Sequence, residues 1–133
     1  MKHFAVALAG LALAIAPAAA NDVVSKLLKQ YESQGGARFT SASAESLWSR
    51  EFRDAKTGEA RRCSTCHSED LRRNGKHATT GKAIEPLAPS VNPKRLTDPE
   101  HIEKWFSRNC KWTFGRECTA QEKGDFLLMI AAR

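Results

Sequence analysis

Residues 63–67 read Cys-Ser-Thr-Cys-His, a CxxCH pentapeptide. Two thiols at this spacing can add across the vinyl groups of a haem, and the adjacent imidazole then lies where one nitrogen can bind the iron. We therefore expect Cys63 and Cys66 to attach one haem c covalently and His67 to be its proximal ligand. Such a cofactor also decides the fold, because it gives short helices a large apolar body around which to pack.

A CxxC pair also occurs in zinc sites and in thioredoxin-type redox sites. A structural zinc site needs four clustered ligands, whereas the other two cysteines, Cys110 and Cys118, are separated by bulky residues such as Trp112 and Phe114. A thioredoxin motif accompanies a βαβ pattern, and the sequence shows no strand alternation. The sequence favours haem attachment, and a structural module in which the CxxC thiols form a disulfide stays as a further alternative.

The first 20 residues have the pattern of a secretory signal peptide. Lys2 precedes an apolar run from Phe4 to Ala16, and small residues lead up to Ala20. The run is shorter than the ~20 residues that span a bilayer, and the small residues suit cleavage after Ala20. We expect export to the periplasm, cleavage of residues 1–20 and no insertion in the membrane afterwards.

The composition fits one small domain. The formal net charge of +6 is modest and dispersed, and no repeat of aromatic and basic residues is present, so we expect no nucleic-acid partner. After the signal peptide we divide the chain into an N-terminal helix and linker, residues 21–42, and a haem domain, residues 43–133.

Two segments before the pentapeptide have apolar residues at helical spacing. They cover residues 22–33 and 43–52. The polar stretch 54–62, which leads into the motif, is expected to be a loop.

Two further helices carry signals at their first residues. Thr97 or Asp98 can cap one of them, with Pro99 at its first helical position. A capping box that begins at Thr119 opens the last helix. We therefore expect an all-α fold, a class I cytochrome c-like single domain around one covalently bound haem.

The stretch between His67 and Pro99 is rich in Gly and Pro, which forbids a long helix. Such a segment can wrap a flat cofactor with backbone and small apolar groups. Ile84, Leu87 and Ala88 are its expected haem contacts. The alternative is a surface linker, because many Pro-rich stretches are only that.

The third helix places an amide at the end of an apolar face. Ile102, Trp105, Phe106 and Asn109 follow the i, i+3, i+4, i+7 pattern of one helix face. An unpaired amide would be costly there, so Asn109 is a candidate for a specific role. We expect Trp105 and Phe106 to contact the haem.

Electron-transfer cytochromes complete the iron with Met or a second His. Met129 lies in an apolar run of the last helix, where a Met is more often core filler than a ligand. His77 lies in a basic, Gly-flanked loop and His101 in the first turn of a helix, where solvent exposure is the default. A six-coordinate electron carrier with His77 or Met129 on the iron stays as the alternative.

Cys110 and Cys118 remain once the haem has taken two thiols. An oxidising compartment disfavours idle thiols, so these two are expected to pair with each other. The bridge would either hold the segment beside Asn109 in place or simply join two helices, and both interpretations stay open.

Four stretches carry a resemblance to a known family. They read CSTCH at 63–67, TGKAIEPLAPS at 80–90, EKWFSRNC at 103–110 and GRECT at 115–119. The chain resembles the oxygen-binding monohaem cytochrome c family of the sphaeroides haem protein (DUF1924) type. The combination of Arg-Asn-Cys with Gly-Arg-x-Cys at this spacing is the discriminating part.

The resemblance implies a role for Asn109. In that family the asparagine of the Arg-Asn-Cys motif is the distal iron ligand, and the two cysteines that follow form a disulfide. A neutral amide is a weak ligand, so the resemblance implies that Asn109 leaves on reduction and that ferrous haem binds O₂, NO or CO. Any turnover, such as reducing O₂ or oxidising NO, would rest on family analogy alone.

Basic residues flank the haem motif. Between residues 61 and 82 there are six of them against two acidic ones: Arg61, Arg62, Arg72, Arg73, Lys76 and Lys82. A positive ring near a haem edge would steer an acidic redox partner. We expect another cytochrome to donate electrons by docking near Arg61, Arg62, Arg72 and Arg73; a solubilising surface is the alternative.

Overall fold

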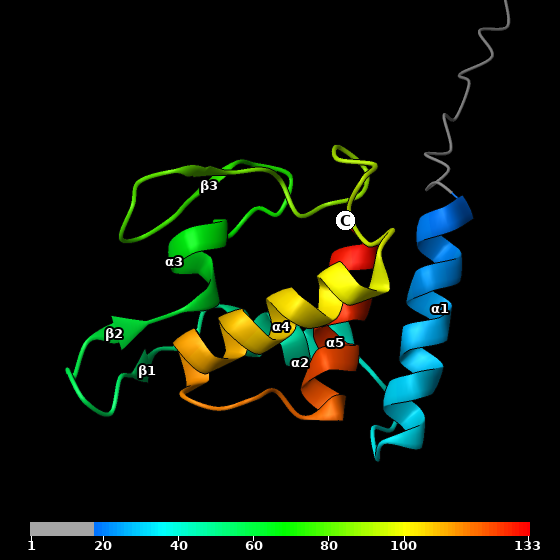
Figure 1. Cartoon of the computed structure of the whole chain (residues 1–133), viewed down its shortest axis with the longest axis horizontal. Helices are drawn as coiled ribbons and strands as arrows, with labels where there is room; N and C mark the ends of the chain where they lie inside the picture. The colour runs from blue at the N-terminus through cyan, green and yellow to red at the C-terminus, as the bar shows by residue number, and fades with distance from the viewer. Residues whose placement is uncertain (1–17) are drawn as a thin grey trace, which may run out of the picture.

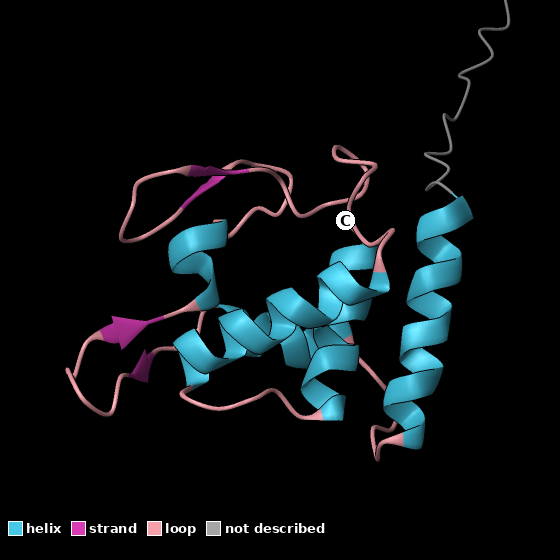
Figure 2. Cartoon of the chain, viewed as in Figure 1, coloured by secondary structure: helices cyan, strands magenta, loops and turns pink. Residues whose placement is uncertain are grey.

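The structure is a computed structural model that describes residues 18–133 (Figures 1 and 2). Its helices are α1 (Ala18–Ser33), α2 (Ser41–Trp48), α3 (Cys63–His67), α4 (Pro99–Phe114) and α5 (Ala120–Ala131). Two small antiparallel hairpins pair β1 (Phe52–Arg53) with β2 (Ala60–Arg61) and β3 (Gly75–Lys76) with β4 (Ala83–Ile84). The expectation of a helical fold is confirmed. Over the part of the chain described, no helix is long and apolar enough to cross a membrane.

α1 packs along α5, as Figure 1 shows at the right of the molecule. Its buried residues join Ile102 and Leu127 in one apolar cluster made of Val24, Leu27, Tyr31, Ile102 and Leu127. The helix predicted at 22–33 is therefore present, and it begins earlier, at Ala18. Residues 1–17 of the predicted signal peptide lie outside the described residues.

A second apolar cluster lies between α2, α4 and α5. Its aromatic rings are in contact: Phe126 lies 6.2 Å from Trp48 and 6.5 Å from Phe106 between ring centroids. Leu71 and Ala88, from the stretch between α3 and α4, are buried in the same cluster. This stretch therefore packs against the helices.

The predicted starts of the last two helices are confirmed. The Asp98 carboxylate accepts hydrogen bonds from the backbone N–H groups of Glu100 and His101, so Asp98 rather than Thr97 caps α4. Thr119 and Glu122 form the capping box of α5. Both signals are local in sequence, which is why they predict the helix ends well.

α2 and the segment after it differ from the prediction. α2 runs over Ser41–Trp48 and not over 43–52. Phe52 instead lies in β1 and packs against Phe114 of α4, with 4.5 Å between the ring centroids. β2 likewise lies within the stretch 54–62, which was expected to be a loop. Contacts between distant segments override the local helical pattern here.

Candidate haem site

α3 carries the CxxCH motif on a single helical turn. The chain leaves this turn at Ser68, whose positive φ of 69° ends the helix. β3 lies directly against the turn because Gly75 has no side chain: a Cβ there would come within 2.0 Å of the Cys66 carbonyl oxygen. So short a helix is not stable alone, and contacts such as this one hold it.

Both thiols of the motif are free, while Cys110 is disulfide-bonded to Cys118. Burial raises the pKa of Cys63 to about 11, and a hydrogen bond with Thr113 acts in the opposite direction. Redox-active CxxC sites depress the pKa of their attacking thiol instead. The raised pKa of Cys63 is thus the opposite of what a thioredoxin-type site needs.

His67 is partly buried. Burial, and secondarily the positive charge of Arg95, lower the pKa of His67 to about 4. The imidazole is therefore neutral at physiological pH, which is the form that binds a metal. Its ring lies 5.8 Å from that of Trp48 between centroids, and its buried Nδ1 has no hydrogen-bond partner among the described residues.

Asn109 approaches His67 from α4. Its Nδ2 lies 3.5 Å from His67 Nε2, although the two residues are 42 positions apart in the sequence. Asn109 is partly buried, and it follows buried Ile102 and partly buried Phe106 along α4. The fold thus brings together His67 and Asn109, which the sequence analysis predicts to be the two protein ligands of the iron.

The other member of the expected apolar face is placed differently. Trp105 is 40% exposed, so it does not pack into the apolar clusters of the chain as Phe106 does. Its ring is flanked by neighbours on its own helix: the Arg108 guanidinium lies 5.2 Å from the ring centroid and the His101 ring 5.9 Å away. Trp105 lies one helical turn before Asn109, on the same side of α4.

The disulfide joins the last turn of α4 to the segment that precedes α5. Cys110 and Cys118 have Cα atoms 5.5 Å apart. Gly115 ends α4 in the left-handed conformation, with φ 71°, between the two cysteines. Arg61 donates a hydrogen bond of 2.9 Å to the Trp112 carbonyl, which ties β2 to the same segment. The end of α4 that follows Asn109 is therefore held by a covalent and a polar contact.

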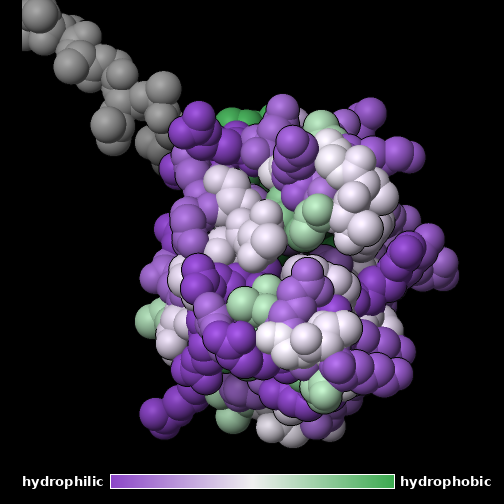
Figure 3. All heavy atoms as spheres, turned by 90° about the vertical axis from the view of Figure 1, so that its left-hand side faces the viewer, coloured by the Kyte–Doolittle hydropathy of each residue, from purple (hydrophilic) through white to green (hydrophobic). Residues whose placement is uncertain are grey.

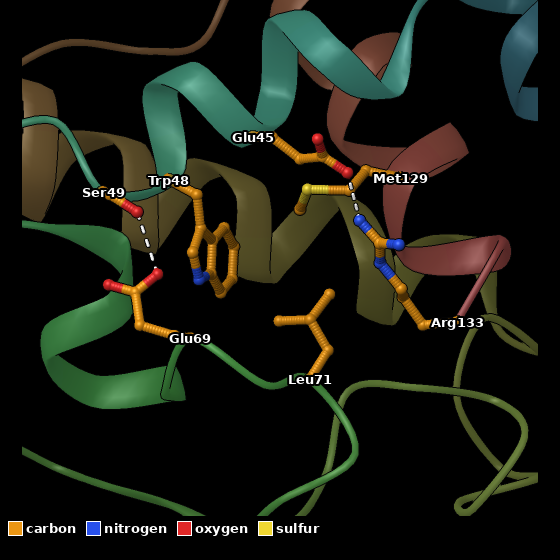
Figure 4. A pocket seen from close by; sticks show the side chains of 7 residues that line it. All are labelled: Glu45, Trp48, Ser49, Glu69, Leu71, Met129 and Arg133. Carbon is orange, nitrogen blue, oxygen red and sulfur yellow. Dashed lines mark hydrogen bonds and ion pairs between the residues drawn. The ribbon is translucent and has the colours of Figure 1, made fainter.

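Three other side chains could compete for the iron, and each lies either in the apolar core or at the surface. Met129 is 2% exposed in the apolar core and borders, with Trp48 and Leu71, the pocket drawn in Figure 4. His77 is exposed, and its Nδ1 accepts hydrogen bonds from the backbone N–H groups of two threonines in the turn between β3 and β4, Thr79 and Thr80. His101 is also exposed.

The Pro-rich stretch is not a surface linker. The Leu71 carbonyl accepts hydrogen bonds of 3.0 Å from the backbone N–H groups of Leu87 and Ala88. Ala88 and Pro89 are buried, and Leu87 is partly buried against the apolar cluster. The stretch lies folded against α3 and the helices, where the sequence expected it to line the cofactor.

The basic residues near the motif fall into two groups. Arg61 pairs with Asp54 at 2.8 Å and is 16% exposed, and Arg62 pairs with Glu51 at 2.8 Å. Arg72, Arg73, Lys76 and Lys82 are exposed, and they form no ion pair within residues 18–133. The face that bears α3 and the hairpins is largely hydrophilic in Figure 3.

The sequence alone does not indicate that four further residues contact or support the site. Trp48 reads as an ordinary apolar helix residue, Thr113 as part of a helix, Gly75 as a loop glycine and Arg95 as a surface charge. Their roles depend on contacts between distant segments, for which a single sequence gives no signal.

Comparisons with known proteins agree on one family. The profile of DUF1924, described as a domain of unknown function, matches residues 34–130. The cytochrome c-type protein SHP of Cereibacter sphaeroides is 40% identical over 121 residues, which cover 88% of this chain and 90% of that protein. Cytochrome c″ of Methylophilus methylotrophus is 38% identical over 84 residues, which cover 63% of this chain and 58% of that protein.

Solved structures of the same two relatives share the fold. Oxidised SHP, described as an oxygen-binding cytochrome c, matches with a TM-score of 0.73 and 38% identity, covering 83% of this chain and 96% of SHP. Oxidised cytochrome c″ matches with a TM-score of 0.73 and 29% identity, covering 86% and 94%. A solution structure of cytochrome c″, described in terms of haem-ligand detachment, matches with a TM-score of 0.70 and 29% identity, covering 86% and 93%.

Fold and motif together define the class of the protein, which is a class I-like c-type cytochrome with one haem c. Within that class the chain belongs to the DUF1924 family. The expected fold class, family and cofactor are thereby confirmed.

Proposed function

We propose that this cytochrome binds a small diatomic molecule at a coordination site that opens on reduction. Cys63 and Cys66 attach the haem, and His67 is its proximal ligand. Asn109 is the distal ligand in the ferric state and leaves the iron in the ferrous state. The observation that carries the proposal is the distance of 3.5 Å between Asn109 Nδ2 and His67 Nε2.

The residues present fit such a haem. Cys63, Cys66 and His67 would hold the haem, and the Asn109 amide lies beside His67, so its oxygen could supply the second protein ligand to the iron. His67 is neutral, because burial lowers its pKa to about 4, and a neutral imidazole is the form that binds a metal.

Asn109 supplies the property that separates a gas binder from an electron carrier. A side-chain amide is neutral and binds iron weakly, so it is displaced far more easily than Met or a second His. Once released, its N–H group can donate a hydrogen bond to the molecule that takes its place. The description of SHP as oxygen-binding and of cytochrome c″ by haem-ligand detachment supports the same behaviour.

Three side chains are proposed as haem contacts. Leu87 and Phe106 are partly buried and pack against the apolar clusters of the core. Trp105 lies on the same side of α4 as Asn109, where its exposed ring would cover the distal side. Its position one turn from the ligand lets it limit the size of the molecules that reach the iron.

Spectroscopy of ferric variants tests the assignment of the distal ligand. We expect Asn109→Ala to change the ferric absorption and electron paramagnetic resonance spectra, because a water molecule or an open position replaces the amide. His77→Ala and Met129→Leu are matched controls and should leave both spectra unchanged. An unchanged Asn109→Ala spectrum, with a changed spectrum in either control, would establish the electron-carrier alternative.

We propose that the electron donor, an acidic cytochrome, docks at Arg72 and Arg73 and at the neighbouring Lys76 and Lys82. Arg61 and Arg62 were part of the docking site predicted from the sequence, but their charges are balanced by carboxylates. Arg72→Glu with Arg73→Glu should slow reduction by an acidic c-type cytochrome at low salt. The control Arg38→Glu, on an exposed residue of the α1–α2 connection, should slow it less; equal slowing would contradict this docking site.

We propose export to the periplasm as the location of this function. The intact mass of the periplasmic protein should equal residues 21–133 plus one haem. A protein retained in the cytoplasm with residues 1–20 attached would contradict the proposed processing.

A further inference from the structure

Arg95 is held in place by two backbone carbonyls. Its Nε donates to the Pro86 carbonyl and its Nη2 to the Glu85 carbonyl, each at 2.9 Å. Asn92 donates to the same Pro86 carbonyl at 3.2 Å. These bonds close the loop from 85 to 95 on itself and fix the guanidinium in one orientation. Nη1 forms no hydrogen bond within residues 18–133.

Within residues 18–133, the positive charge of Arg95 has no carboxylate at ion-pair distance. Arg61, Arg62 and Arg116 each form an ion pair, whereas Arg95 forms none among the residues described. Glu85 attracts it through space, but the Glu85 carboxylate is hydrogen-bonded to Asn92 and lies beyond ion-pair distance. Arg95 is partly buried, and desolvation lowers its pKa. A partly buried charge of this kind is costly unless an anion pairs with it.

The segment that carries Arg95 packs beside the haem motif. Leu87, within the loop that Arg95 closes, and Leu96, directly after it, are packed against the same apolar cluster as Cys63. Leu71 and Ala88 are buried members of this cluster, so the loop and the motif share one apolar support. A fixed cation without an ion-pair partner among residues 18–133 therefore lies on a loop that packs beside the haem motif.

We propose that Arg95 binds a propionate carboxylate of the haem through its unused guanidinium N–H groups. The inference rests on the proposed placement of the haem between His67 and Asn109. Haem brings two carboxylates into the site, and a planar guanidinium pairs with a carboxylate through two parallel hydrogen bonds. Arg95 is thus a positioning residue: it orients the cofactor and links it to the loop that carries Leu87.

The pairing has a consequence for the redox equilibrium. Ferric haem carries one more positive charge than ferrous haem, so a nearby cation disfavours the ferric state. Arg95 therefore raises the reduction potential. Because the proposed gas-binding site opens only in the ferrous state, Arg95 favours the state that binds the diatomic ligand.

Two spectroscopic readouts of the haem-loaded protein test the pairing. In Arg95→Gln we expect the propionate bending mode of the resonance Raman spectrum to shift to lower frequency, and the midpoint potential to fall. Arg95→Lys keeps the charge but loses the bidentate geometry, so its midpoint should lie between those of the wild type and Arg95→Gln. The control Arg38→Gln removes an exposed arginine that forms no ion pair within residues 18–133, and it should leave the bending mode unchanged.

The result that overturns the proposal is equally specific. If Arg95 only closes its loop, Arg95→Gln and Arg95→Lys will lower the melting temperature and leave the propionate mode and the midpoint unchanged. Should Arg95→Gln fail to fold, an unshifted propionate mode in Arg95→Lys overturns the pairing on its own. The outcome is separable from that for Asn109, because the bending mode reports on the propionates and the ferric spectrum reports on the axial ligands.

Discussion

The two halves of the molecule are held together differently. In the helical half, formed by α1, α2, α4 and α5, large side chains such as Tyr31 are fully buried against one another. In the loop half, residues 50–98, the buried residues are Leu71, Ala88 and Pro89. The loop half is held mainly by backbone hydrogen bonds, such as that from the Ala88 N–H to the Leu71 carbonyl. From this difference we predict that the helical half keeps its fold without the haem and that the loop half depends on the haem.

Removing the haem attachment should separate the two halves most clearly. In Cys63→Ser with Cys66→Ser, we expect amides of the loop half to lose roughly 100-fold or more of their exchange protection, the factor that corresponds to about 2.7 kcal/mol of ligand linkage. Amides of α1, α4 and α5 should stay protected. Hydrogen exchange read by mass spectrometry measures both, with Ser64→Ala as the control that keeps the motif. An equal loss of exchange protection in the two halves would contradict the proposed difference between them.

Gly75→Ala should destabilise the loop half directly. The new Cβ would meet the Cys66 carbonyl oxygen at 2.0 Å, and backbone cannot move aside as a side chain can. We expect a loss of about 3 kcal/mol, the upper part of the range for overpacking. Thermal unfolding of the haem-loaded protein measures it. The neighbouring exposed Asn74→Ala should unfold at the wild-type temperature, and identical unfolding of both variants would contradict the close contact.

Tyr31→Phe should weaken the helical half and leave the haem undisturbed. The Tyr31 hydroxyl donates a hydrogen bond of 2.5 Å to Glu103, which Lys123 also contacts at 2.6 Å. Because Lys123 still satisfies the carboxylate, we expect a loss of about 1.5 kcal/mol, the lower end for a hydrogen bond to a charged group. Denaturant unfolding gives the loss. A changed haem absorption spectrum in this variant would show that the halves are not independent.

The smallest expected effect concerns the first turn of α5. Arg116, and then the Thr119 backbone N–H, lower the pKa of Glu122. A depressed carboxylate pKa stabilises the fold above the unfolded value of about 4.3, and this contribution is lost as the pH falls through the folded pKa. Glu122→Gln should therefore cost less than about 1 kcal/mol at pH 7. The difference in melting temperature from the wild type should shrink below about pH 4; a difference that grows there would contradict the ion pair.

The sequence predicts the parts of the fold that local signals determine. Asp98 and Thr119 cap their helices through hydrogen bonds that span two or three residues, so their effect does not depend on the rest of the chain. α2 shows the opposite case. The residues after Trp48 leave the helix because Phe52 packs against Phe114, a contact that the sequence does not predict.

The candidate site divides in the same way. Cys63, Cys66 and His67 form a motif whose chemistry is evident from the residues alone. The position of Asn109 beside His67 depends on how α4 crosses the site, and periodicity predicts only the helix face. The exposure of Trp105 and the hydrogen bonds that fix Arg95 depend on the folded arrangement of the chain, so they become visible only in the structure.

Binding of carbon monoxide to the reduced, haem-loaded protein tests the central proposal most directly. If Asn109 leaves the iron on reduction, CO will bind rapidly and completely, and the absorption spectrum will change to that of a CO adduct. A ferrous spectrum that stays six-coordinate and is unaffected by CO would contradict the proposed opening of the site.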